Sequence, residues 1–113
     1  MKLKFPKTIL VGDTRFTIKL DKERTGGEFS YWGEYKDGVA KGGYIIIGTF
    51  LLKVNPLQVL NTIIHELQEI ICVEQGTRFP VPHHDNAYEF HYNHRQHTEL
   101  CSRLAGLLEQ FIK

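Results

Sequence analysis

The sequence predicts an α+β fold in which a small antiparallel sheet of about three strands precedes two helices. Three observations predict it. Short segments in the first half alternate between polar and apolar residues or are rich in aromatic and β-branched ones, whereas residues 56–74 and then residues 93–113 repeat apolar side chains at helical spacing. With 113 residues, the chain is expected to form one domain, residues 1–113, with a single modest core.

The strands are expected in the first half. Residues 15–20 alternate polar and apolar side chains at period two, which is typical of a half-buried strand, and residues 29–35 are rich in aromatics. Asp37-Gly38 and Gly42-Gly43 then mark turns. Residues 44–50 are β-branched and aromatic on both faces, which predicts a strand that is covered on both sides.

Asn55 and Pro56 begin the first expected helix, because asparagine is a favoured N-cap and proline is tolerated at the first helical position. The helix should reach about Glu74 and end at Gly76. Counted in steps of about 100°, its apolar side chains fill one arc of about 160°. The polar residues lie on the other side: Gln58, Asn61, Thr62, His65, Glu66, Gln68 and Glu69.

Residues 77–93 contain two prolines and a His83-His84-Asp85 cluster, which indicates an irregular connection or a short extra helix. The cluster could cap a cleft, bind substrate or be solvated. A last helix is expected to begin near Asn93 and to run to the C-terminus. Its core-facing stripe consists of Leu100, Leu104, Leu107, Leu108 and Phe111.

The charge balance and the number of cysteines indicate which classes of partner and which cellular compartment to expect. There are 14 basic and 13 acidic side chains, interspersed along the chain, so we expect neither a nucleic acid nor a membrane surface as partner. No stretch has the length of a membrane span, and the N-terminal residues lack the apolar core of a signal peptide. Two cysteines are too few for a disulfide framework and suit a reducing compartment, with the cytoplasm as the default. Nothing in the sequence indicates an oligomeric state.

The segment His65-Glu66-Leu67-Gln68-Glu69 has the layout of a metallohydrolase helix. His65 and Glu69 project from one face a turn apart, close enough to bind one ion, whereas Glu66 points about 100° away from His65. A carboxylate there can accept a proton from a water molecule at the metal. A zinc site with this chemistry needs three protein ligands and one open position. The alternative is the ordinary solvated face of an amphipathic helix.

His97 is the first candidate for the third ligand. It falls within the apolar stripe of the last helix, near its N-terminal end, and is therefore expected to point inward. Burying an imidazole without a partner is costly, and a metal held by the facing helix would satisfy it. His94 is the second choice and His91 the third. A core histidine that bonds to a backbone carbonyl is the alternative.

The chain resembles a group of small zincin-like proteins, assigned as metallopeptidases and often encoded by phages and mobile elements. Their signature is a His-Glu-Ile/Leu-x-Glu-Ala-Ile helix, and here residues 65–71 read His-Glu-Leu-Gln-Glu-Ile-Ile. An isoleucine-rich strand precedes that helix, as in residues 44–47. A histidine opens the last helix, which contains a Leu-Ala-x-Gly-Leu type segment, and residues 103–108 are similar with the glycine shifted by one position.

The resemblance covers about half of the chain and implies a zinc-dependent peptidase that acts on a peptide or protein substrate. It implies His65, Glu69 and a histidine near position 97 as Zn²⁺ ligands, and Glu66 as the general base. The usual zincin helix has two histidines and a remote glutamate, whereas this helix has Glu69 at the second position. The exchange keeps one anionic and two neutral ligands.

Two further features bear on a peptide substrate. Tyr88, Tyr92 or a histidine of the connection could donate a hydrogen bond to the oxyanion, and the sequence does not choose among them. The strand at residues 44–50 could pair with an extended peptide if it lies at an exposed edge of the sheet.

Two rival functions stay open. In the first, the ion stabilises a non-catalytic binding module, and the thiolates of Cys72 and Cys101 could close the coordination sphere. The second is an HNH-like nuclease, a motif that requires a β-hairpin before its helix and a cationic surface. Its residues would be His83, His84, Asp85, Asn93 and His97.

Overall fold

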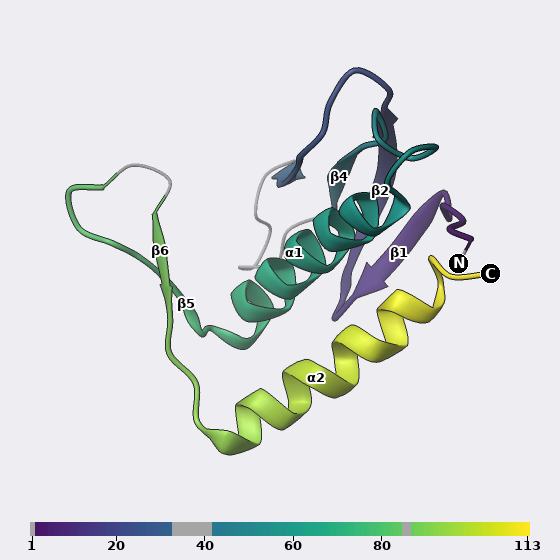
Figure 1. Cartoon of the computed structure of the whole chain (residues 1–113). Helices are drawn as coiled ribbons and strands as arrows, with labels where there is room; N and C mark the ends of the chain where they lie inside the picture. The colour runs from purple at the N-terminus through teal and green to yellow at the C-terminus, as the bar shows by residue number, and fades with distance from the viewer. Residues whose placement is uncertain (1, 33–41, 85–86) are drawn as a thin grey trace.

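The computed structural model describes residues 2–32, 42–84 and 87–113. It confirms the α+β class (Figure 1). The elements in chain order are β1 (Thr8–Val11), β2 (Thr14–Asp21), β3 (Gly27–Trp32), β4 (Gly42–Gly48), α1 (Pro56–Gln75), β5 (Arg78–Pro80), β6 (Tyr88–Phe90) and α2 (His94–Glu109). Residues 33–35 of the expected aromatic strand and the expected turn at Asp37-Gly38 lie outside the described residues. The expected turn at Gly42-Gly43 is wrong, because both glycines lie in β4.

The main sheet has four strands in the order β1-β2-β4-β3. β1 pairs antiparallel with β2, β2 pairs parallel with β4, and β4 pairs antiparallel with β3. The expectation of about three antiparallel strands is therefore wrong in number, and the sheet is mixed because the β2–β4 pair is parallel. β1 has four residues, too few for a period-two pattern to stand out in the sequence. β4 is an interior strand, which agrees with its continuous apolar character.

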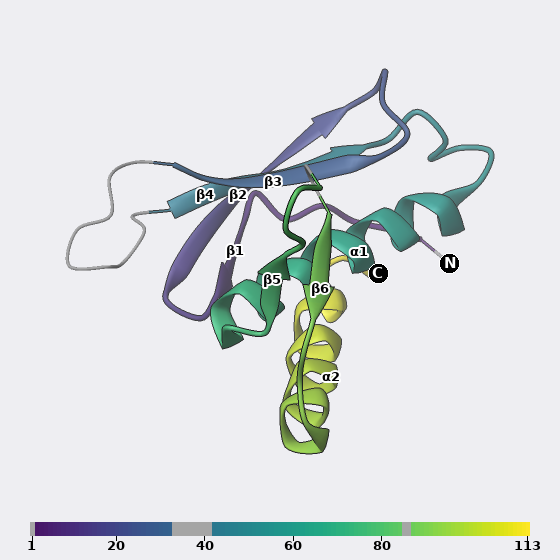
Figure 2. The ribbon, with the colours of Figure 1, turned by 90° about the vertical axis from the view of Figure 1, so that its left-hand side faces the viewer.

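α1 forms a second layer on one face of the sheet (Figure 2). Its predicted boundaries are confirmed to within a residue: Asn55 is the N-cap and accepts a hydrogen bond from the Gln58 backbone N–H, and Gly76 ends the helix with a left-handed φ of 72°. The core lies between this helix, the sheet and α2. Its largest fully buried side chains include Phe16, Ile45, Ile47, Ile63, Leu67, Ile70 and Phe111.

α2 begins as predicted and ends earlier. Asn93 and Gln96 form a reciprocal capping box, with N···O distances of 2.9 and 3.0 Å. The helix ends at Glu109 rather than continuing to the C-terminus. Beyond it, Phe111 is buried and its carbonyl oxygen accepts a hydrogen bond from the Lys4 N–H at 2.8 Å. The last residues therefore turn back onto the N-terminal segment instead of extending the helix.

The connection between the helices is a β-hairpin, which the sequence did not reveal. β5 and β6 pair antiparallel, with Arg78 opposite Phe90 and Pro80 opposite Tyr88. The hairpin lies beside the C-terminal end of α1 (Figures 1 and 2). Each strand has three residues, so neither could show a periodic pattern in the sequence. Within the described residues, neither α1 nor α2 has the combination of length and apolar character that crossing a bilayer requires.

Candidate metal centre

His65 and Glu69 meet on the surface of α1. The Nε2 atom of His65 lies 2.7 Å from Oε2 of Glu69, as the spacing of four residues in a helix allows. The two side chains differ in exposure: that of His65 is 65% exposed and that of Glu69 17%. The pair therefore joins an accessible imidazole to a carboxylate that is held against the protein.

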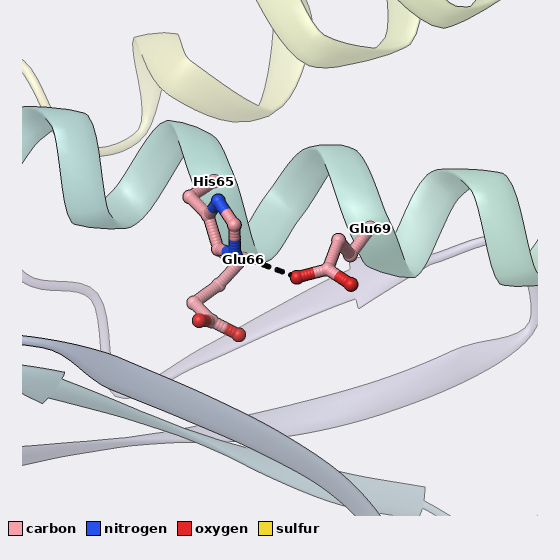
Figure 3. A group of neighbouring side chains, drawn as sticks. All are labelled: His65, Glu66 and Glu69. Carbon is pink, nitrogen blue, oxygen red and sulfur yellow. Dashed lines mark ion pairs between the residues drawn. The ribbon is translucent and has the colours of Figure 1, made fainter. Parts of the chain in front are cut away.

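Glu66 is buried, with 5% of its surface exposed, although its helical position predicted the polar side of α1. The reason lies in the sheet, because α1 packs against β3 at Gly27, which has no side chain. A Cβ atom at Gly27 would lie 3.2 Å from Cγ of Glu66 and 2.8 Å from Cγ2 of Thr62. Glu66 and Thr62 thus fill the space that a side chain on β3 would occupy. Figure 3 shows Glu66 pointing from α1 toward the strands.

Burial raises the pKa of the Glu66 carboxyl above its ordinary value. His65 and Arg78 lower this pKa, while the neighbouring carboxylates of Glu69 and Glu28 raise it further. Among the described residues, no hydrogen bond to the Glu66 carboxyl is found. Its neutral form is therefore favoured in the folded protein, and a positive ion bound beside it would stabilise the charged form.

The three side chains form a group that could hold a metal ion. One ligand atom from each of His65, Glu66 and Glu69 lies within 4.8 Å of the others, and no other group of three or more His, Cys, Asp or Glu side chains occurs in the described part of the chain. An imidazole nitrogen with two carboxylate oxygens is a suitable donor set for a divalent transition metal. His65 and Glu66 also line a groove of about 280 Å³, together with Gly26, Gly27, Asn61 and Thr62. Two of the three donors, His65 and Glu66, therefore face a space that an ion or a small substrate group could enter.

Arg78 is a neighbour of this group that sequence reasoning missed. Its Nε atom lies 3.2 Å from Oε1 of Glu69, and its guanidinium stacks 3.4 Å above the ring of Tyr88. No motif marks this arginine, because it becomes a neighbour of Glu69 only when the chain turns back after Gly76 into β5. Tyr88, a candidate oxyanion donor, contacts this guanidinium with the face of its ring.

The inward orientation predicted for His97 is wrong. Its side chain is exposed, stacks on Tyr92 with a ring separation of 5.6 Å, and is not a member of the metal-binding group. Its rivals His94 and His91 are exposed as well. In Figure 3, α2 lies on the side of α1 opposite to the strands toward which Glu66 points. This geometry therefore gives no support to His97 as a zinc ligand.

Neither cysteine joins the group. Cys72 is fully buried, and burial raises the pKa of its thiol, which disfavours the thiolate that a metal requires. Cys101 is exposed on α2, with its Sγ atom 3.8 Å from Nε2 of His97. The proposed closure of the coordination sphere by these thiols therefore does not occur in the structure.

The structure contains the hairpin that the nuclease alternative requires, but it does not bring the histidines of that alternative together. The hairpin that an HNH-like site requires is present, since β5 and β6 lead into α2. Its histidines, however, do not come together: His83 and His84 are exposed in the hairpin loop, and among the described side chains they form no metal-binding group with His97. Asp85 lies outside the described residues.

No protein-family model, curated protein or solved structure matches this chain. The resemblance to small zincin-like proteins therefore rests on the motif around His65 and the order of the elements, and membership in that group stays a prediction. The finding that stands is a His65-Glu66-Glu69 group on a helix that is backed by a four-stranded mixed sheet.

Proposed function

We propose that this protein is a zinc-dependent hydrolase of peptide amide bonds, in which His65 and Glu69 bind the ion and Glu66 is the general base. The observation that carries the proposal is the state of Glu66. Its carboxyl group is buried, has a raised pKa and lines the same groove as His65. A base that must accept a proton near neutral pH and later release it requires this kind of environment.

The three side chains divide the work of hydrolysis between them. When bound, zinc supplies Lewis acidity and brings the pKa of a neighbouring water molecule toward neutrality. His65 contributes a neutral nitrogen donor from the exposed side, and Glu69 contributes an anionic oxygen donor 2.7 Å away. Glu66 accepts the proton of the attacking water and donates it to the leaving amine, which a carboxyl with a raised pKa does more readily than an ordinary one.

A peptide is the substrate that the neighbouring sheet fits best. The condition for peptide pairing at residues 44–50, an exposed edge, is not met, because β4 lies between β2 and β3. The strand next to the site is instead β3, which is an edge strand and starts at Gly27 beside Glu66. An extended peptide that pairs with this edge would pass the groove that His65 and Glu66 line.

The proposed compartment and partner class follow from the two free thiols and from the balance of charges. Cys72 and Cys101 are both free, which suits a reducing compartment, and we propose the cytoplasm. With 14 basic and 13 acidic side chains, the protein has no excess of charge to attract a nucleic acid or an anionic membrane. A peptide or protein is therefore the proposed partner.

One observation favours a second candidate, a metal-stabilised module without catalysis. A catalytic zinc site has three protein ligands and an open position. Among the described residues, Glu66 is the one further donor that lies beside His65 and Glu69. If Glu66 is a ligand, it is not free to act as a base, and the ion then contributes to folding instead of chemistry.

Replacement of Glu66 by glutamine separates the two candidates, with Glu109→Gln as the control because Glu109 is exposed at the far end of α2. Each protein is purified without a nickel column and reconstituted with zinc. Metal content is measured by plasma mass spectrometry, and hydrolysis is measured with a fluorogenic peptide library. For the hydrolase, we expect Glu66→Gln to keep its zinc and to lose activity by about 10²- to 10⁴-fold.

The other outcomes are equally informative. Loss of zinc in Glu66→Gln assigns Glu66 as a ligand and supports the non-catalytic module. A parent protein that takes up no zinc contradicts both candidates. A parent that holds zinc but cleaves no peptide contradicts the peptidase proposal alone.

A further inference from the structure

Arg78 connects three parts of the molecule at the proposed metal site. Its guanidinium stacks on Tyr88 of β6 at 3.4 Å and lies 5.3 Å from the ring of Phe29 on β3. Its Nε atom approaches Glu69 of α1 to 3.2 Å. The side chains of Arg78 and Glu69 are each only 17% exposed, so this ion pair is shielded from water and from salt. It is therefore well placed to hold Glu69 in one orientation.

The two oxygens of Glu69 have different neighbours. Oε2 lies 2.7 Å from His65, on the side where the donors converge, and Oε1 lies 3.2 Å from Arg78, on the side of the hairpin. The Nε–H of Arg78 is buried and has no hydrogen-bond acceptor among the described residues, because the approach to Oε1 is close but poorly aligned. Oε1 is the oxygen within reach of that donor, so the arginine favours a carboxylate that keeps Oε1 turned toward it.

We infer that Arg78 is a positioning residue, which holds Glu69 by Oε1 so that Oε2 is presented to the metal as a single donor atom. The inference rests on the proposed metal site. The aromatic rings of Tyr88 and Phe29 fix the plane of the guanidinium, and through it the β5–β6 hairpin sets the orientation of a ligand on α1. Partners of this kind around a metal site typically change metal affinity by about 10- to 100-fold when they are removed.

The sign of the effect separates positioning from simple electrostatics. Arg78 is a cation close to the site of another cation, so its removal should strengthen metal binding if charge alone matters. If Arg78 positions Glu69, its removal frees the carboxylate and weakens binding. The two roles therefore predict changes in opposite directions for the same variant.

The test measures zinc affinity by competition with a chromophoric chelator for the parent, Arg78→Met and Arg78→Lys. We expect Arg78→Met to weaken binding by about 10- to 100-fold. Arg78→Lys keeps the charge but loses the planar group that stacks on Tyr88, and we expect it to weaken binding in the same direction. Arg103→Met removes the same charge from the exposed surface of α2 and should leave the affinity unchanged.

Circular dichroism and urea unfolding establish that each variant is folded. If Arg78→Met does not fold, the zinc affinity of Arg78→Lys decides between the two roles. Affinity that is unchanged or increased in the folded Arg78 variants, with zinc still bound by the parent, overturns the positioning role and leaves the proposed function standing. Failure of the parent to bind zinc overturns the proposed function, and the positioning role fails with it.

Discussion

Two helical faces of this protein carry residues with metal-ligand spacing, and only one of them gathers a group of three donors in the described structure. On α1, ligand atoms of His65, Glu66 and Glu69 lie within 4.8 Å of one another. On α2, His94, His97 and Cys101 also share a face, but all three are exposed and the one contact among them is that of His97 with Cys101 at 3.8 Å. Spacing along a helix is thus necessary for such a group and is not sufficient.

The difference comes from what each face packs against. α1 lies on the sheet, and the missing side chain at Gly27 allows Glu66 to enter the layer between them. The N-terminal part of α2 diverges from α1 and from the sheet, as Figure 2 shows. The ring of His97 stacks on Tyr92, which belongs to the segment that precedes α2. A buried carboxylate and a converging donor set require an opposing surface.

The largest effect that can sharpen this contrast is the loss of zinc from ligand variants. We expect His65→Ala and Glu69→Ala each to lower zinc affinity by more than the roughly 10- to 100-fold typical of a supporting residue, because each removes a donor atom. His97→Ala should match the parent. Zinc content after gel filtration and the affinity from chelator competition provide the measurement.

A loss of zinc in His97→Ala would break the contrast, since it would mean that α2 reaches the site in solution. His94→Ala belongs in the same series, because that histidine was the second choice for the third ligand. Retention of zinc in His65→Ala would remove the α1 group from consideration.

A smaller effect is expected from filling the space at Gly27. In Gly27→Ala the new methyl group would meet the Ile46 carbonyl oxygen at 2.7 Å and Cγ2 of Thr62 at 2.8 Å, so α1 or β3 must shift. We expect the free energy of unfolding to fall by roughly 1–3 kcal/mol, as for other overpacked sites. The neighbouring Gly26→Ala is the matched control, because nothing lies within 4 Å of its added Cβ. Urea unfolding of both variants measures the difference.

Equal stability of the two glycine variants would contradict the close packing of α1 on β3. A selective loss in Gly27→Ala that also weakens zinc binding would instead connect this contact to the position of Glu66.

The smallest effect is the pH dependence of stability in the metal-free protein. Because burial raises the pKa of Glu66, the folded state binds its proton more tightly than the unfolded state does. The contribution of Glu66 to stability is therefore greatest below the ordinary carboxyl pKa, and it is lost as the pH rises through the raised value. We expect Glu66→Gln to flatten this part of the profile and to be more stable than the parent at neutral pH.

Urea unfolding in the presence of a chelator, from about pH 4 to pH 8, measures this slope. Glu109→Gln serves as the control and should keep the profile of the parent. An identical slope in Glu66→Gln and the parent would mean that Glu66 ionises normally in the folded state, and the argument for a general base would lose its basis.

The sequence predicted the features that depend on neighbours along the chain. Asn55, Pro56 and Gly76 bound α1 as expected, and Asn93 caps α2. The pairing of His65 with Glu69 follows from the rise and turn of a helix. These features are local, so the residues that create them lie within one or two turns of each other.

Features that depend on distant segments were missed or misjudged. β1 and the β5–β6 hairpin are too short to show a period, and the parallel pairing of β2 with β4 follows from no local pattern. His97 was expected in the core because its position continues the leucine stripe of α2, but its side chain is exposed and its ring stacks on Tyr92. The contact of Arg78 with Glu69 depends on the β5–β6 hairpin, so no local pattern in the sequence predicted it.

What the sequence alone determined is the presence of the His65-Glu66-x-x-Glu69 helix, its ends and its apolar face. The tertiary structure decided which polar residues of that helix are buried, which strand forms the edge beside them and which arginine contacts Glu69. The physical reason is that helix geometry is fixed by bonds between residues four apart, whereas burial and the pKa of Glu66 depend on the space that Gly27, 39 residues earlier in the chain, leaves open.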